Sequence, residues 1–319
     1  MTNDKNIGLE KCYEKVKLIQ EGINRVFVGK EEVVEKVLIC LLAGGHVLLE
    51  DVPGVGKTTL AETFAGIVSC SFGRIQFTPD TLPGDVIGVS VYNMKTGEFE
   101  YREGAVMNQI LLADEINRTS PKTQASLLEA MSENQVTVDG VVYPLKMPFM
   151  VIATQNPIEY LGTYPLPEAQ MDRFMMRLSI GYPDKEQEIR MASLFLEGKT
   201  PRTVLPVCKG EEVMEMRQAV EAVTVKESIL AYIQEIVALT RTEKRFVTGA
   251  SPRAMLALIR ASQAKAVLEG RDYVLPDDVK AVAVDVLLHR FTLSSEATIS
   301  QANPEGILSS LILKAKIPF

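Results

Sequence analysis

Hydrophobic residues near the start of the chain recur with a helical period. Five apolar residues, spaced by three and four positions, predict an amphipathic helix from Leu9 to about Asn24. A second helical pattern runs from Glu31 to Ala43 and ends at two consecutive glycines. The apolar face of the first predicted helix consists of Leu9, Cys12, Val16, Ile19 and Ile23.

Short apolar runs of strand length follow, and helical patterns lie between several of them. The first run leads through a glycine-rich turn into a predicted helix from Thr58 to about Val68. Alternating strands and helices are typical of an α/β domain with a mostly parallel sheet. The predicted strands are His46–Glu50, Phe72–Thr78, Gln109–Ala113, Phe149–Thr154 and Met176–Ile180.

Two further segments predict hairpins that project from the sheet as insertions. The first pairs Val89–Tyr92 with Glu98–Tyr101 across a Lys-Thr-Gly turn. The second pairs Gln135–Val138 with Val141–Leu145. The Asp-Gly dipeptide between its strands suits a tight turn in which both central residues are left-handed.

After about Pro183 the strand patterns stop and helical patterns take over. We therefore expect two domains, an α/β domain over residues 1–182 and a small all-helical domain over residues 183–319. A chain of 319 residues fits two domains, since one domain averages about 150 residues. The helices expected in the second domain are Lys185–Glu197, Glu211–Ala222, Lys226–Thr242, Pro252–Leu268, Pro276–Leu288 and Pro304–Lys314.

Composition limits the classes of partner. Apolar residues make up 46% of the chain, which is enough for a proper core and excludes a largely disordered protein. The net charge of −7 and the pI near 5.2 argue against nucleic acid as the default partner. The longest apolar stretch, Val37–Leu49, is too short and too glycine-rich to span a membrane. No signal-peptide pattern opens the chain, so we expect a soluble, cytoplasmic protein without membrane insertion.

Cysteine and histidine offer little material for redox or metal chemistry. The cysteines are widely spaced and form no Cys-x-x-Cys pair, so we expect reduced thiols and no zinc site. His46 and His289 are the only two histidines, and we interpret both as structural. The four cysteines are Cys12, Cys40, Cys70 and Cys208.

The glycine-rich turn Asp51-Val-Pro-Gly-Val-Gly-Lys-Thr58 joins a predicted strand to a predicted helix. This is the context in which a P-loop binds a triphosphate. Gly54 and Gly56 allow backbone N–H groups to point at the phosphates, and the helix N-terminus adds positive potential. Lys57 would reach the β- and γ-phosphates, and the Thr58 hydroxyl would ligate Mg²⁺.

Asp51 departs from the P-loop pattern, because it stands where the first glycine is expected. The Pro53-Gly54 pair can still supply the turn. We expect the Asp51 side chain to lie outside the anion-binding backbone, so Asp51→Gly would be nearly neutral for ATP binding. A carboxylate facing the phosphates would instead make that variant bind ATP about tenfold more tightly.

The apolar strand Ile110-Leu-Leu-Ala-Asp114-Glu115 ends in two carboxylates. Asp114 would join the Mg²⁺ shell, and Glu115 would act as the base for an attacking water. Together with the P-loop this pattern predicts ATP hydrolysis. A nucleotide-regulated scaffold without turnover is disfavoured because Glu115 is present.

Several sequence blocks follow one another in a set order between Val28 and Arg290. They are Asp114–Gln124, Ala153–Pro157, Leu166–Phe174, Gly249–Ala254, Gly270–Val274 and His289-Arg290. Together these blocks resemble MoxR-type AAA+ ATPases, of the helix-2-insert group related to magnesium chelatase ATPase subunits. The resemblance implies an α/β P-loop NTPase (AAA+) core with a parallel sheet and two β-hairpin inserts, followed by a small all-helical lid.

The resemblance also implies roles for single residues. Asn156 resembles the first sensor, which orients the lytic water, and Arg173 resembles the arginine finger that reaches a neighbouring subunit's site. Arg253 resembles the second sensor, which couples the nucleotide to the lid of its own chain. Arg118 and Arg177 are weaker finger candidates. The residues expected to bind ATP or ADP are Val28 and Gly29 at the adenine, Pro53, Gly54, Val55, Gly56, Lys57, Thr58, Thr59 and Arg253.

The function implied by this resemblance is Mg²⁺-dependent ATP hydrolysis in a ring, as a hexamer, that remodels or matures partner proteins in a chaperone-like way. Client proteins of this family often carry a von Willebrand A-type domain. An ATP-driven nucleic-acid motor is the alternative, disfavoured because the second hairpin tip carries Asp139 and no Lys or Arg. A small-molecule kinase shares the P-loop, but should lack Asn156, Arg173 and Arg253 in these contexts.

Overall fold

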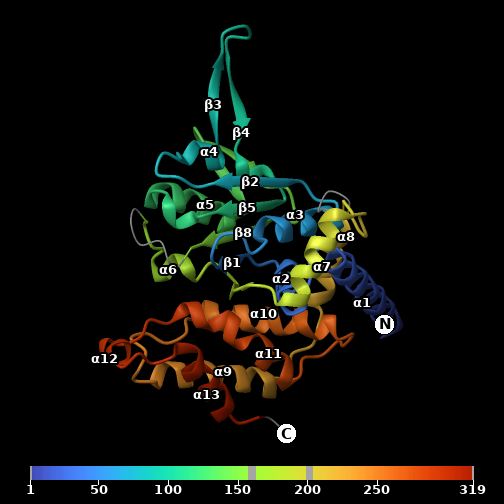
Figure 1. Ribbon diagram of the computed structural model, residues 1–319, viewed down its shortest axis with the longest axis vertical. Coiled ribbons are helices and arrows are strands. Elements are labelled where there is room, and N and C mark those ends of the chain that lie inside the picture. The colour runs from blue at the N-terminus through green and yellow to red at the C-terminus, as the bar shows by residue number, and fades with distance from the viewer. Residues whose placement is uncertain (1, 157–162, 199–203, 318–319) are drawn as a thin grey trace.

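A five-stranded parallel sheet forms the centre of the computed structural model, which describes residues 2–156, 163–198 and 204–317 (Figure 1). Its strands are β1 (Val47–Glu50), β2 (Phe72–Gln76), β5 (Ile110–Asp114), β8 (Met150–Gln155) and β9 (Met176–Leu178). They lie in the order β2-β5-β8-β1-β9 and all pair in parallel. The predicted α/β class and its five strands are confirmed, and the last strand ends two residues earlier than expected.

Helices cover both faces of the sheet. They are α1 (Thr2–Asn24), α2 (Glu31–Leu42), α3 (Lys57–Ile67), α4 (Pro83–Ile87) and α5 (Pro121–Glu133). Successive strand residues point to opposite faces, so Val47 and Ile110 enter the core completed by α1, α2 and α3. Leu48 and Leu111 enter the second core, completed by α4 and α5.

Both predicted hairpins are present and stand outside the sheet. One pairs β3 (Gly88–Asn93) with β4 (Glu98–Glu103), and Figure 1 shows it projecting far from the sheet. The other pairs β6 (Gln135–Val138) with β7 (Val141–Pro144). The φ angles of Asp139 and Gly140 are 49° and 79°, so both turn residues are left-handed, as the Asp-Gly pair predicted.

The described chain after β9 is helical. It forms α7 (Lys185–Leu196), α8 (Gly210–Glu221), α9 (Glu227–Thr242), α10 (Pro252–Leu268), α11 (Pro276–Leu287), α12 (Ser295–Ile299) and α13 (Pro304–Lys314). The five-residue α12 was not predicted, because it is too short to show a period. Helices α9 to α13 form a layer below the sheet in Figure 1. The predicted division at residue 182 stays a prediction, since α8 contacts α1 and α2 as well as α10.

Buried thiols and imidazoles occur where the sequence expected structural residues. All four cysteines are unpaired, and burial raises the pKa of the Cys12 thiol to about 11. Burial also lowers the pKa of His46 to about 4. Its Nδ1 accepts from the Val151 N–H at 3.0 Å, and Nε2 lies 3.1 Å from the Met131 carbonyl. This arrangement requires the neutral ring. In the described residues, no helix is long and apolar enough to cross a membrane.

Acid is expected to destabilise the fold through His46. The folded pKa of about 4 lies below the value of about 6.5 for an exposed histidine, so the unfolded chain binds more protons between these pH values. The contribution of His46 to the free energy of unfolding is therefore fully present above about pH 6.5. It falls by about 3 kcal/mol as the pH approaches 4. Urea unfolding from about pH 7 to about pH 4.5 measures this loss. The variant His46→Gln should lose less stability over the same range, and an equal loss would exclude His46 as the cause.

Candidate functional site

The glycine-rich turn between β1 and α3 adopts a conformation that needs its glycines. Gly54 and Gly56 have φ angles of 89° and 94°, in a region that residues with a Cβ rarely adopt. A Cβ on Gly56 would also lie 3.2 Å from the Phe27 ring. The turn places Lys57 and Thr58, the first residues of α3, at the edge of a cavity. The N-terminus of α3 thereby faces a place suited to an anion.

This P-loop cavity has a volume of about 400 Å³ and lies at the carboxyl ends of the strands. Ligands of open parallel sheets bind at this edge. The structure brings together eight predicted site residues from three separate segments, and their roles stay predictions. The residues that line the P-loop cavity are Pro53, Gly54, Gly56, Lys57, Thr58, Arg74, Gln76, Asp114, Glu115 and Asn156.

The two carboxylates at the end of β5 are held by hydrogen bonds. Asp114 accepts from the Thr154 hydroxyl at 2.7 Å and from the Arg74 guanidinium at 2.8 Å. The Glu115 N–H donates to the same threonine hydroxyl at 2.9 Å, and Glu115 has a left-handed backbone with φ 56°. A non-glycine residue in this conformation is strained and is common at functional sites. These contacts fix the Asp114 carboxylate and the backbone of Glu115 at the cavity.

Arg74 and Gln76 are cavity residues that the sequence reading missed. Both lie on β2, and Arg74 donates to the Gln76 side chain at 3.0 Å as well as to Asp114. An arginine inside a predicted buried strand was the available signal, because a charged side chain there needs a partner. The partner follows from the pairing of β2 with β5, which local sequence does not show.

Three basic side chains of the predicted site pair within their own chain. Arg118 donates to the Glu115 carboxylate at 3.0 Å, and Arg177 lies 3.1 Å from the Glu50 carboxylate. Lys57 donates to the backbone carbonyl of the first P-loop residue at 2.8 Å. Burial lowers the pKa of Lys57, while the nearby Asp114 opposes that shift. The finger candidates Arg118 and Arg177 thus contact carboxylates near the P-loop of the same chain.

A small apolar pocket of about 50 Å³ adjoins the P-loop cavity through Gly56, which lines both. Val28, which the sequence assigned to the adenine, lines it together with Val55 and Thr59, and this role stays a prediction. Gly29 lies beside the pocket, and its carbonyl accepts from the Gln187 side chain at 3.0 Å. We call this the base pocket.

A second group of arginines lies apart from the P-loop. Arg173, Arg253, Arg260 and Arg290 line a cavity of about 310 Å³ together with Asp172, and we call it the arginine cavity. Arg290 lies 3.2 Å from the Asp172 carboxylate. The exposed Arg253 sits in the first turn of α10. Arg253 thus lines the arginine cavity and not the P-loop cavity of its own chain, and its assignment as second sensor stays a prediction.

Arg173 is anchored on α5. Its guanidinium donates to the Leu128 carbonyl at 2.7 Å and to the Ser132 hydroxyl. Both acceptors belong to the helix that follows the Asp-Glu pair of β5, so the arginine is held without a carboxylate partner of its own in these contacts. Its charge stays available to an incoming anion.

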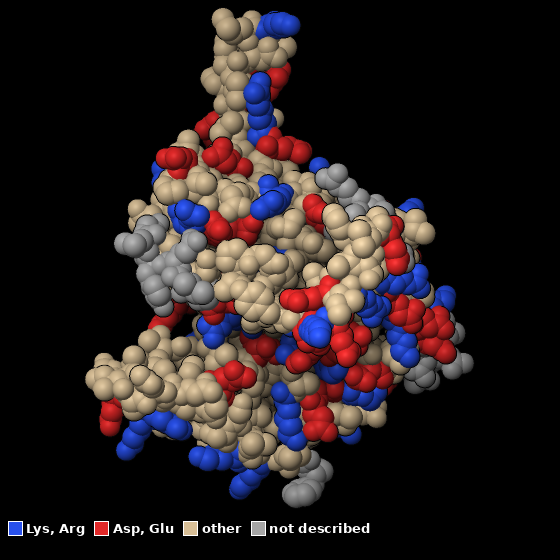
Figure 2. Space-filling view, viewed as in Figure 1, with Lys and Arg blue, Asp and Glu red and all other residues tan. Residues whose placement is uncertain are grey.

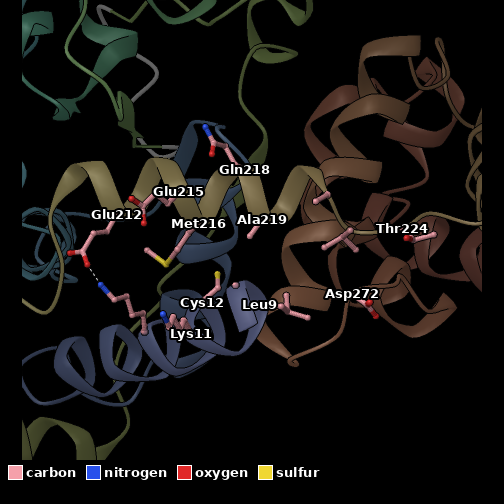
Figure 3. A pocket seen from close by; sticks show the side chains of 14 residues that line it. Leu9, Lys11, Cys12, Glu212, Glu215, Met216, Gln218, Ala219, Thr224 and Asp272 are labelled. Atoms are coloured by element: carbon pink, nitrogen blue, oxygen red, sulfur yellow. Dashed lines mark hydrogen bonds and ion pairs between the residues drawn. The ribbon is translucent and has the colours of Figure 1, made fainter. Parts of the chain in front are cut away.

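Cavity size alone does not identify the site. A larger cavity of about 670 Å³ lies between α1 and α8, with Thr224 and Asp272 at one end (Figure 3). Leu9, Cys12 and Met216 form much of its apolar wall, and none of the P-loop residues line it. The smaller P-loop cavity is the one lined by the left-handed glycines Gly54 and Gly56 and by Lys57 at the N-terminus of α3.

Known proteins resemble this chain over nearly its whole length. The profile of the ATPase family associated with various cellular activities (AAA) matches residues 46–176, and the AAA lid domain matches residues 238–311. Protein YeaC of Bacillus subtilis is 51% identical over 298 residues, covering 93% of each chain. Chaperone MoxR1 of Mycobacterium tuberculosis is 40% identical over 305 residues, covering 93% of this chain and 80% of MoxR1.

A solved structure from Cytophaga hutchinsonii, assigned as an ATPase, shares the fold with a TM-score of 0.92 at 40% identity. It covers 100% of this chain, and 98% of that chain is covered in turn. The profiles, the relatives and the solved structure agree with the P-loop geometry described above. This chain therefore belongs to the MoxR-type AAA ATPases and is an ATP hydrolase.

Proposed function

We propose that this chain hydrolyses ATP with Mg²⁺ as part of a ring-like oligomer and uses the reaction to remodel or mature other proteins. The observation that carries the proposal is the P-loop cavity, where Lys57, Glu115 and Asn156 line one space of about 400 Å³. The chaperone name of MoxR1 supports the remodelling part.

Nucleotide binding is assigned to the P-loop and the base pocket. The backbone N–H groups of residues 54–58 would cradle the phosphates, and Lys57 would neutralise them. The buried Val28 and Val55 would enclose the adenine, because an apolar pocket favours a flat base over water.

Thr58 and Asp114 fit a magnesium ion. Both line the P-loop cavity and present oxygen atoms, the ligands that Mg²⁺ prefers. Two protein ligands suffice, because Mg²⁺ in such sites takes the rest from phosphates and water. When bound, the ion neutralises charge on the phosphates. Arg74 holds the Asp114 carboxylate at the cavity edge.

Hydrolysis is assigned to Glu115, which would accept a proton from the attacking water while Asn156 orients that water. The Glu115 carboxylate is paired with Arg118 at 3.0 Å in the structure. This contact engages only Oε2 of Glu115, so the second carboxylate oxygen can accept the proton while Arg118 stays in place.

The arginine cavity is assigned to the nucleotide of a neighbouring subunit. It gathers four arginines with one aspartate, so its field favours an anion. Arg173 and Arg253 share this cavity and are absent from the P-loop cavity lining of their own chain. We therefore extend the finger assignment of Arg173 to Arg253, so that both residues act in trans.

Specific ATPase activity is expected to rise with protein concentration, because each P-loop cavity needs arginines from a neighbour. The measurement compares turnover per subunit over a dilution series with sedimentation of the same samples. Turnover should increase over the range in which the sedimentation coefficient increases. Constant turnover per subunit for a sedimenting monomer would contradict the ring proposal.

Protein remodelling and nucleic-acid translocation predict different stimulators of the ATPase. A purified client with a von Willebrand A-type domain should raise turnover and change its own protease sensitivity only when ATP is hydrolysed. DNA or RNA should bind weakly, since acidic and basic side chains intermingle on the face in Figure 2. Filter binding across a salt series measures this, and tight, strongly salt-dependent binding would favour a motor.

A further inference from the structure

Asp51 is a buried carboxylate at the start of the P-loop with three hydrogen-bond donors of its own. Only 6% of the residue is exposed. One carboxylate oxygen accepts from the Ser179 hydroxyl at 2.9 Å and the Gly181 N–H at 3.1 Å. The other accepts from the Ile180 N–H at 2.6 Å. A buried charge is stable only when paired or fully hydrogen-bonded, and these donors meet that need.

All three donors belong to the segment directly after β9. Strands β1 and β9 pair in parallel up to Leu49 and Leu178. Beyond that point, the Asp51 carboxylate accepts hydrogen bonds from the N–H groups of residues 180 and 181. Hydrogen bonds to the Asp51 side chain thus extend the contact between β1 and β9 beyond their last paired residues. This also explains why β9 ends earlier than its apolar pattern predicted.

The segment held by Asp51 forms a wall of the base pocket. Ile180 and Gly181 line that pocket together with Val28, Val55 and Gly56. On its far side the segment is tied to the 28–30 turn, since Lys30 donates to the Tyr182 carbonyl at 2.9 Å. The backbone of Asp51 meanwhile belongs to the P-loop and accepts from Lys57. One residue therefore connects the phosphate side of the site to the adenine side.

We propose that Asp51 is a positioning residue that clamps the base-pocket wall at residues 179–181 to the P-loop, so that adenine and triphosphate bind at a set separation. The proposal rests on the proposed nucleotide site and adds a role at a position where the P-loop pattern has glycine. A glycine there would supply the turn but no clamp.

A clamp at Asp51 predicts that Asp51→Gly weakens ATP binding, in contrast to the near-neutral effect expected from the sequence. The side chain does lie outside the P-loop cavity, as expected. Its removal would leave the buried Ile180 N–H, the half-buried Gly181 N–H and the Ser179 hydroxyl without their acceptor. The wall would then drift from the P-loop, and adenine would add less to binding.

The test separates the two halves of the ligand. A fluorescent ATP analogue is displaced from the Mg²⁺-containing protein by ATP or by inorganic tripolyphosphate, which uses the P-loop alone. In Asp51→Ala we expect ATP to bind about tenfold more weakly, while tripolyphosphate keeps its affinity. Asp51→Asn, which retains one acceptor oxygen, should fall between the parent and Asp51→Ala. Ser179→Ala removes one donor and should have the smallest effect.

The matched control is Asp278→Ala. Asp278 is 3% exposed and accepts from the Arg271 guanidinium and from the Leu275 N–H at 2.7 Å, but lies on α11. Its loss should lower the melting temperature without changing the ratio of ATP to tripolyphosphate affinity. A general loss of stability therefore cannot explain a changed ratio of ATP to tripolyphosphate affinity in Asp51→Ala.

Three outcomes would overturn the clamp. Equal weakening of ATP and tripolyphosphate in Asp51→Ala would mean that Asp51 only shapes the P-loop. Unchanged affinities would mean that the clamp has no role in binding, and tighter ATP binding would mean that the carboxylate repels phosphate. Absence of ATP binding by the parent protein is a different result, because it would overturn the nucleotide site itself.

Discussion

Replacement of Arg173 by alanine is expected to lower the ATP hydrolysis rate by roughly 10³- to 10⁵-fold, the range known for arginine fingers. ATP affinity should stay within a few-fold of the parent, since Arg173 is absent from the P-loop cavity lining of its own chain. Turnover and equilibrium ATP binding, measured on the same samples, give the two values. Loss of ATP binding in this variant would place Arg173 in its own site.

Mixing inactive variants shows from which subunit each arginine acts. In a mixed ring, Arg173→Ala subunits keep an intact P-loop, and Lys57→Ala subunits keep an intact finger. Activity should therefore return when the two exchange subunits. If exchange is proven and no activity returns, the assignment in trans is wrong.

A second mixture locates Arg253, which the sequence assigned to its own chain and the structure places beside Arg173. If both arginines serve the same neighbouring site, mixing Arg173→Ala with Arg253→Ala restores nothing, because no interface supplies both. If Arg253 acts within its own chain, the intact Arg253 of one variant and the intact Arg173 of the other would meet. Recovery of activity in that mixture would contradict our proposal.

Glu115→Gln is expected to lower turnover by roughly 10²- to 10⁴-fold, the usual contribution of a general base, while ATP remains bound. The amide keeps the size of the side chain but cannot accept the proton of the water. Lys57→Ala should instead lose ATP binding, because the cradle loses its cation. Single-turnover hydrolysis and nucleotide titration measure the two effects.

Glu133→Gln is the matched control for the base assignment, since Glu133 is an exposed glutamate at the end of α5. It should hydrolyse ATP at the parent rate. If Glu115→Gln also did so, another group would have to accept the proton, and the assigned base would be wrong.

The sequence alone determined the α/β class, the P-loop, the Asp-Glu strand end and both hairpins. These features are local. Periodicity of two or 3.6 sets which residues face a core, and a turn such as Asp139-Gly140 is set by the φ angles that its residues tolerate. The strand before Asp114 and the helix after Gly56 could therefore be predicted without knowing their neighbours.

Only the tertiary structure decided how distant segments combine at the site. Arg74 reaches Asp114 because β2 pairs with β5, and Asp51 clamps residues 179–181 because β1 pairs with β9. Arg253 lines the same cavity as Arg173 because α10 packs beside it. Each contact joins residues far apart in the chain, and its geometry depends on strand order and helix packing. Local sequence patterns show neither strand order nor helix packing. The sequence therefore predicted the type of side chain at the site but not the residue that it contacts.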